Sequence, residues 1–233
     1  HLLSRRQRQM CIRDRDKTEK FMFDGERLIQ HIIKQRYFEE EISNEVNLSY
    51  SDNQVTVTTD YPTLVYTLNS EGYASQCVYS LSSQNRIYQF SYSAEGYLTG
   101  IVENIDNTEY SSTSLTYENG DITSISSKMN GLENKFIYEP GEESSTYHLP
   151  CLGLLEIHPL TFHIEALYAG LLGKDPRHFT IRSCPAGSND EKTIYSYEFD
   201  KKGNPSRMIC QTTYAGGQAS YYPYTRNISV SFE

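Results

Sequence analysis

The stretch "FSYSAEGYLTGI" (residues 90–101) contains the pattern that decides the fold. Phe90 and Tyr92 are two residues apart, a polar run containing Gly96 follows, and alternating apolar and polar residues then resume. Alternate residues of a β-strand face the same side of a sheet, and a glycine in a polar run is typical of a turn. The stretch therefore predicts a β-hairpin with one apolar face.

The same pattern recurs along most of the chain, which has 20 Tyr, 9 Phe and no Trp in 233 residues. Successive strands joined by short turns form an antiparallel meander, and aromatic alternation favours half-buried sheets over helix bundles. The related stretches are "FMFDGERLIQHI" (21–32), "VYTLNSEGYASQCV" (65–78), "LTYENGDITSI" (115–125), "FIYEPGEES" (136–144) and "YSYEFDKKGNPSRMI" (195–209).

Each predicted turn has a glycine where the backbone needs a positive φ. Asp-Gly and Asn-Gly pairs suit type I′ turns, a glycine after several polar residues suits a turn with a bulge, and Pro-Gly suits a type II turn. The predicted turn glycines are Gly25 and Gly120 of the first kind, Gly72, Gly96 and Gly203 of the second, and Gly141 of the third.

One segment departs from the strand pattern. After Pro159, the residues Leu160, Ile164, Leu167 and Leu171 follow helical spacing. We expect one short helix near 160–172, ended by the glycine and proline that follow, which plugs an open end or covers a sheet edge. The predicted fold is all-β: an antiparallel hairpin meander, curved or closed into a barrel-like sheet, with this single helix.

The repeated hairpins, "AGLLGK" (169–174) and "YSYEFDKKGNPSRM" (195–208) resemble a family of lipoproteins of unknown function with a porin-like β fold, from gut anaerobic Gram-negative bacteria. The resemblance covers residues 20–233. It implies an export signal upstream, a location in the cell envelope (periplasm or outer-membrane lipoprotein) and a lipid anchor to the outer membrane. It supplies no catalytic residues.

Residues 1–15, "HLLSRRQRQMCIRDR", resemble a translated sequencing adaptor, and we expect them to form an artefactual tail before a single β domain at 16–233. They hold five of the 21 basic and one of the 30 acidic residues, so the domain has a net charge of about −13. Such an acidic domain has no electrostatic footprint for binding nucleic acid.

Four cysteines lie outside this tail, of which Cys151 and Cys184 flank the helical segment. A disulfide between these two would tie the segment down, and four free buried thiols are the alternative. The other two cysteines are Cys77 and Cys210.

Several histidines lie near Cys151, so a metal site has to be considered. His158 and His163 have a spacing that zinc sites use, but no second ligand pair follows, and Pro159 separates them. We expect no metal and no cofactor. The other two histidines of the segment are His148 and His178.

Catalytic motifs for nucleophilic serine, phosphate binding, zinc hydrolysis and dinucleotide binding are absent from the sequence. We expect a non-catalytic envelope protein that binds a glycan, a peptide or a partner protein through a tyrosine-rich sheet surface. Tyrosines that are simply sheet core are an equal alternative. An outer-membrane β-barrel protein is a further alternative, and a hydrolase of envelope polymers is a more distant one.

Overall fold

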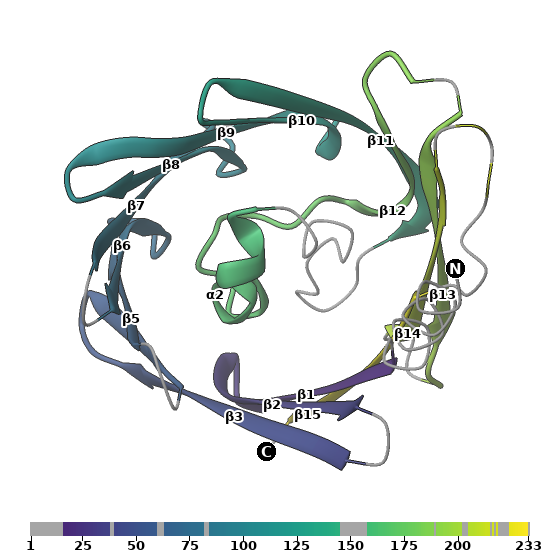
Figure 1. The fold of residues 1–233 in the computed structure, drawn as a ribbon. Coiled ribbons are helices and arrows are strands. Elements are labelled where there is room, and N and C mark those ends of the chain that lie inside the picture. The colour runs from purple at the N-terminus through teal and green to yellow at the C-terminus, as the bar shows by residue number, and fades with distance from the viewer. Residues whose placement is uncertain are drawn as a thin grey trace.

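The computed structural model describes residues 16–37, 40–59, 63–81, 84–144, 158–188, 190–201, 205–214, 216, 218 and 224–232. In this part of the chain, 15 strands form one sheet closed into a barrel, with a short helix inside it (Figure 1). The predicted all-β hairpin meander is confirmed. The strands are β1 (Asp16–Asp24), β2 (Arg27–Tyr37), β3 (Glu40–Tyr50), β4 (Gln54–Thr58), β5 (Thr63–Leu68), β6 (Ala74–Leu81), β7 (Gln84–Tyr92), β8 (Leu98–Ile105), β9 (Thr108–Glu118), β10 (Asp121–Met129), β11 (Leu132–Ser144), β12 (His178–Pro185), β13 (Lys192–Phe199), β14 (Pro205–Thr213) and β15 (Tyr224–Phe232); the helical elements are η2 (Leu160–Phe162) and α2 (Ile164–Tyr168).

Each strand pairs antiparallel with the next, and β1 closes the barrel by pairing in parallel with β15, with Thr18 opposite Asn227. Parallel closure follows from the odd number of described strands, because alternating directions leave the first and the fifteenth pointing the same way. For the same reason, the turns that follow odd-numbered strands all lie at one end of the barrel.

The core lies inside the barrel, where alternate residues of each strand point. In β4, Val55 and Val57 are buried while Thr56 between them is partly exposed. Burial of one such aliphatic side chain contributes roughly 1.5–3 kcal/mol. The outer positions are largely Ser, Thr, Glu, Gln and Lys, as in β9, where Ser114 and Thr116 are exposed on either side of buried Leu115.

The helical segment lies within the barrel (Figure 1). It is shorter than predicted: α2 ends at Tyr168, and Gly170, two residues later, adopts a left-handed φ of 69° that the helix cannot continue through. The amides of Gly170 and Leu171 donate to the carbonyls of Leu167 and Ala166, which is a Schellman ending. No helix among the described residues has the length and hydropathy to cross a membrane.

The turn glycines Gly25, Gly72, Gly96 and Gly120 have φ values of 57°, 85°, 91° and 89°. Asn119 is also left-handed, with φ 54°, which fits the predicted type I′ turn at Asn119-Gly120. The predicted type I′ turn at Asp24-Gly25 is wrong: Asp24 pairs with Arg27 as the last residue of β1, so Gly25 is the first central residue, as in a type II′ turn. Gly203 lies outside the described residues.

The predicted type II turn at Pro140–Gly141 is also wrong, because both residues lie inside β11. The register with β12 shifts on both sides of Pro140, which forms a bulge where its missing amide hydrogen is tolerated. At Gly141, a Cβ would lie 2.7 Å from Cγ2 of Ile181, so glycine permits a close approach between the two strands. The turn before β11 is Asn130–Gly131, with φ values of 52° and 79°. Asn-Gly is a typical hairpin-turn dipeptide, so this turn is also indicated by the sequence.

Candidate ligand-binding site at the strapped end of the barrel

Residues 171–177, here called the strap, follow α2 and cross three successive hairpin turns. The amide of Ala74 donates to Leu171 O at 2.7 Å, and the amides of Lys174 and Arg177 donate to Gly96 O and Gly120 O at 2.9 and 3.1 Å. Three extended residues span about 10 Å, which is close to the width of two neighbouring strands. Every third residue of the strap therefore contacts one hairpin, and the strap links the three hairpins together. We call this end of the barrel the strapped end.

Two turn glycines under the strap each lie next to the side chains of a tyrosine and of a cationic residue. A Cβ on Gly96 would lie 3.2 Å from Cε2 of Tyr73 and 3.5 Å from Cε of Lys174. A Cβ on Gly120 would lie 2.8 Å from both the hydroxyl oxygen of Tyr97 and Nε of Arg177. The same arrangement is thus repeated one hairpin apart, and both copies need the space that glycine leaves.

Each of these two tyrosines packs against the ring of a further tyrosine. The rings of Tyr73 and Tyr92 have centroids 5.3 Å apart, and those of Tyr97 and Tyr117 are 4.9 Å apart. The Tyr92 hydroxyl donates to Ala74 O at 2.6 Å, which fixes that ring. The sequence repeat explains the arrangement, since "EGY" occurs at 71–73 and again at 95–97.

A cavity of about 1070 Å³ opens at this end, large enough for a ligand of several rings. Its wall is both aromatic and charged. It is lined by Phe23, Tyr73, Tyr97 and Tyr168, by Glu26, Lys174, Asp175, Arg177 and His178, and by Gly25, Ser144, Ala169, Gly170, Gly173 and Pro176.

The charged groups of the cavity differ in their pairing. His178 Nδ1 lies 2.9 Å from Oδ2 of Asp121, whose Oδ1 accepts from the His178 amide. Within the described residues, Lys174 and Arg177 form no ion pair, although backbone hydrogen bonds hold their positions. The hydroxyl of buried Tyr168 has no hydrogen-bond partner in that same part of the chain. The wall thus offers aromatic faces together with cations that are positioned but not neutralised.

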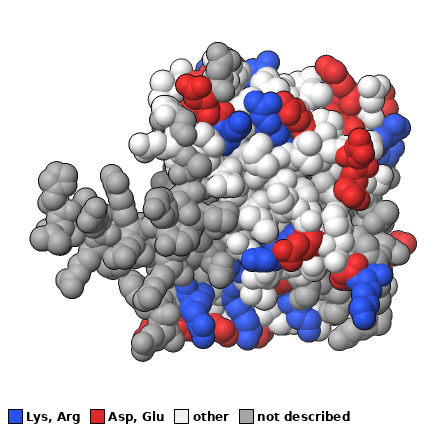
Figure 2. All heavy atoms as spheres, turned by 90° about the vertical axis from the view of Figure 1, so that its right-hand side faces the viewer, with Lys and Arg blue, Asp and Glu red and all other residues white. Residues whose placement is uncertain are grey.

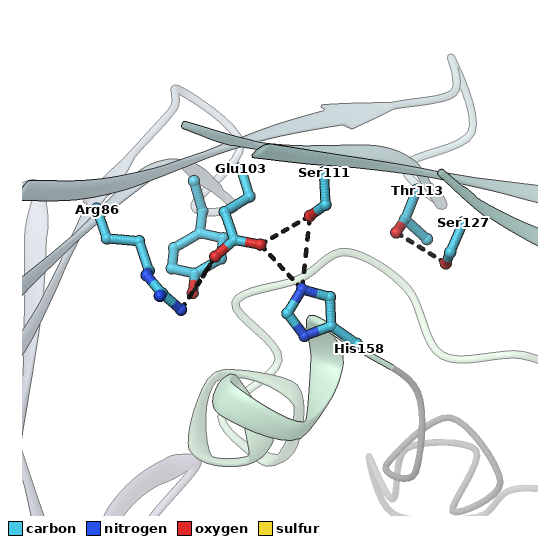
Figure 3. A network of polar contacts seen from close by, with 7 residues as sticks. Arg86, Glu103, Ser111, Thr113, Ser127 and His158 are labelled. Atoms are coloured by element: carbon cyan, nitrogen blue, oxygen red, sulfur yellow. Dashed lines mark hydrogen bonds and ion pairs between the residues drawn. The ribbon is translucent and has the colours of Figure 1, made fainter. Parts of the chain in front are cut away.

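A second polar cluster surrounds Glu103, which is buried and points into the barrel (Figure 3). Its Oε2 accepts from Ser111 Oγ at 2.7 Å and lies 2.9 Å from His158 Nε2, while Arg86 Nη1 is 3.1 Å from Oε1. Burial alone raises the pKa of Glu103, but the contacts with His158, Ser111 and Arg86 outweigh it and lower the pKa.

This cluster contains serine, histidine and an acid but lacks the geometry of a catalytic triad. In a triad the serine and the acid bind opposite ring nitrogens of the histidine. Here, Nε2 of His158 faces both Glu103 and Ser111, the latter at 3.5 Å, and the Ser111 hydroxyl donates directly to Glu103. The serine proton is therefore directed to the carboxylate, and the cluster is an internal charge network.

A third cluster fixes α2 to the barrel where β1 meets β15. Glu19 Oε2 lies 2.8 Å from Arg226 Nε, and Glu19 Oε1 lies 2.8 Å from Lys17 Nζ. His31 contacts Glu19 at 3.4 Å and Glu165 of α2 at 2.7 Å. Burial opposes ionisation of Glu19, yet the His31 hydrogen bond and the nearby cations lower its pKa to about 2.

Aromatic stacking adds to this anchor, because the Phe21 ring lies between the rings of His31 and Tyr168, at centroid distances of 4.1 and 3.5 Å. No motif in the sequence marks Lys17 or Glu19 as part of a buried cluster. Strand alternation was the available signal, since Glu19 has the same parity as Phe21 and Phe23, which also point inward.

The histidines and cysteines that the structure describes are dispersed. His158 faces Glu103, His163 faces Tyr66 and His178 faces Asp121. The described residues contain no group of three or more side chains arranged to hold a metal ion. Cys184 lies on β12, Cys77 and Cys210 are buried, and no disulfide joins any two of these three described cysteines. His148 and Cys151 lie outside the described residues, so the Cys151–Cys184 disulfide stays a prediction.

His163 of the helical segment is fully buried, with Nδ1 2.7 Å from the Tyr66 hydroxyl and its ring edge-on to Tyr88. Burial lowers the pKa of His163 to about 3 from 6.5. As pH falls below 6.5, the unfolded chain binds a proton that the folded chain refuses, so stability is lost progressively down to about pH 3.

We expect this histidine to cost about 2 kcal/mol of stability at pH 5 relative to pH 7. Urea unfolding at both pH values, for the parent and His163→Phe, measures the effect. The variant has no titrating ring at this position, so its loss between the two pH values should be smaller by that amount. Equal losses in both proteins would contradict the assignment of a neutral, buried His163.

The tyrosines predicted to form a sheet surface divide into two groups. Tyr66, Tyr88, Tyr138 and Tyr195 are buried inside the barrel, so for them the core alternative is correct. Tyr73 and Tyr97 follow turn glycines and line the cavity. Among the described tyrosines, Tyr73 and Tyr97 are thus placed beside a cavity at the barrel end.

Comparison with known proteins agrees with this architecture. Residues 21–207 match the family described as a domain of unknown function (DUF4595) with porin-like fold. A crystal structure of a porin-like protein from Bacteroides uniformis is similar, with a TM-score of 0.75 and 27% sequence identity over 85% of this chain and 83% of that one. No curated protein matches the sequence.

Proposed function

The chain belongs to the family of domains of unknown function with a porin-like fold (DUF4595), and from this premise we propose that it is a non-catalytic cell-envelope protein that binds a glycan at the strapped end of its barrel. The observation that carries the proposal is the repeated tyrosine and cation pair over Gly96 and Gly120, beside a cavity of about 1070 Å³. An envelope location is supported by the similarity to a Bacteroides porin-like protein. A lipid anchor is part of the proposal, and labelling with a fatty-acid analogue in the host tests it.

A glycan suits this wall better than a peptide does. Sugar rings have an apolar face that packs on aromatic rings and polar edges that bind charged groups, and the cavity offers both. Peptides are commonly held by addition of a strand to a sheet edge. The closed barrel has no such edge among its described strands.

The side chains on the outer wall of the barrel support the proposal that this wall faces water. Charged side chains of both signs are scattered over the side shown in Figure 2, with uncharged residues between them. Arg182 pairs with Glu139, and Arg207 pairs with Glu198 at 3.0 Å, all with partly or fully exposed side chains. A lipid-facing barrel would instead carry a continuous apolar band of alternate residues on its outer wall.

We expect Tyr97→Ala to weaken glycan binding about tenfold, since loss of a ring contact of this kind costs about 1–2 kcal/mol. A glycan array with residues 16–233 identifies the glycans that bind, and calorimetry then compares the affinities of the variants. Both experiments use detergent-free buffer, in which a lipid-facing barrel would aggregate. Tyr214→Ala is the matched control, because Tyr214 is 52% exposed and lies outside the cavity. Absence of any glycan binding, or equal weakening by both variants, would contradict the proposal.

A further inference from the structure

We propose that the glycan held at the strapped end is acidic, with its carboxylate or sulfate groups bound by Lys174 and Arg177. This inference rests on the function proposed above and specifies its ligand. Both cations line the cavity, and neither forms an ion pair within the described residues. Both residues are solvent-exposed, and an anionic group on the sugar would give each an ionic partner.

The strap fixes the backbone of both cationic residues. Their amides donate to Gly96 O and Gly120 O, and their side chains pass over the same two glycines. Pre-positioned cations lose less conformational freedom when an anion binds than flexible surface lysines do. The site therefore differs from a general basic patch, which would be out of place on a chain of net charge −9.

The acidic residues of the cavity limit where the negative groups of the ligand can lie. Glu26 lies on the turn between β1 and β2, and Figure 1 shows these strands on the wall opposite β9 and β10. Asp175 lies on the strap between the two cations. Glu26 therefore disfavours a negative group of the ligand near the β1–β2 turn, whereas Asp175 separates the two positions, at Lys174 and at Arg177, where negative groups can bind.

The repeat in the turns indicates a chain of more than one sugar unit. The two tyrosine and cation pairs are one hairpin apart, about 10 Å, so a linear chain along the strap reaches both. At the next position, Asp121 replaces the tyrosine that follows Gly72 and Gly96, and it binds His178. The row of pairs ends there.

Calorimetry with three oligosaccharides of equal length tests the inference: an oligohexuronate, a sulfated oligohexose and the neutral oligohexose. We expect the parent protein to bind at least one acidic probe about tenfold more tightly than the neutral one. The double variant Lys174→Gln/Arg177→Gln should lose this preference, and added salt should reduce it in the parent. The carboxylated and sulfated probes identify which anionic group is preferred.

The matched control is Lys128→Gln/Lys135→Gln, which removes two exposed cations from the β10–β11 hairpin. It should retain the preference, and thermal unfolding verifies that all variants fold. Binding of the neutral probe as tightly as the acidic ones, with dependence on Tyr97, would overturn the acidic assignment and leave the proposed function standing. A preference that survives in Lys174→Gln/Arg177→Gln would also overturn it. Absence of binding by all three probes and by the array would remove both proposals.

Discussion

Replacement of Glu19 by alanine is expected to lower the free energy of unfolding by about 3–5 kcal/mol, because it leaves a buried charge without its partner. Arg226 is 3% exposed in its side chain and lies 2.8 Å from Glu19. Lys17 and His31 contact the same carboxylate. The loss would fall where β1 and β15 close the barrel and where α2 is anchored, so the whole domain should be affected.

Urea unfolding at neutral pH measures this change. Glu41→Ala is the matched control, because Glu41 and Lys34 also pair at 3.1 Å but with half-exposed side chains. Exposed ion pairs of this kind contribute about 0–1 kcal/mol. Similar losses in the two variants would show that the Glu19 cluster is not a buried anchor.

Replacement of Gly173 by alanine is expected to cost roughly 3 kcal/mol or more, from two separate effects. Its φ of 88° is left-handed, which costs a residue with a Cβ about 1–2 kcal/mol. The added Cβ would also lie 2.5 Å from the backbone oxygen of Gly96, and overpacking of this kind costs about 1–3 kcal/mol. That oxygen accepts from the Lys174 amide, so the clash would also displace the strap.

Gly187→Ala separates the two effects, because Gly187 has a φ of 81° but nothing within 4 Å of the point that an added Cβ would occupy. It should lose only the left-handed contribution when both variants are compared by thermal and urea unfolding. If Gly173→Ala is no more destabilising than Gly187→Ala, the strap does not press on the Gly96 turn. In that case the cavity wall would also be less rigid than the hydrogen bonds of the strap imply.

The Glu19 cluster and the strap both position the wall of the cavity. The Glu19 cluster holds α2 against the barrel wall, and Leu171, three residues after α2 ends, begins the strap. The cavity wall is therefore positioned by a buried anchor and by backbone hydrogen bonds to the turns. A change in either is expected to reach the ligand site.

The local structure of this protein was determined by its sequence to a large extent. Period-two aromatic alternation and glycine turns depend on neighbours within about ten residues, so the meander and the turns at Gly72, Gly96 and Gly120 were predictable. The sequence-based prediction was wrong where one dipeptide is compatible with two local structures. Pro140–Gly141 suits a turn as well as a bulge, and only the neighbouring β12 favours the bulge.

The candidate site was decided by tertiary structure. Closure pairs residues about 200 positions apart, such as Thr18 with Asn227, and buries Glu19 with Arg226. The strap brings Lys174 and Arg177 onto turns that precede them by more than 50 residues. Such contacts leave no periodicity in the chain, because they depend on the barrel's diameter and on the path of α2 through it. The sequence therefore showed that tyrosines follow the turn glycines, while the closed barrel decided which of them meet a cation.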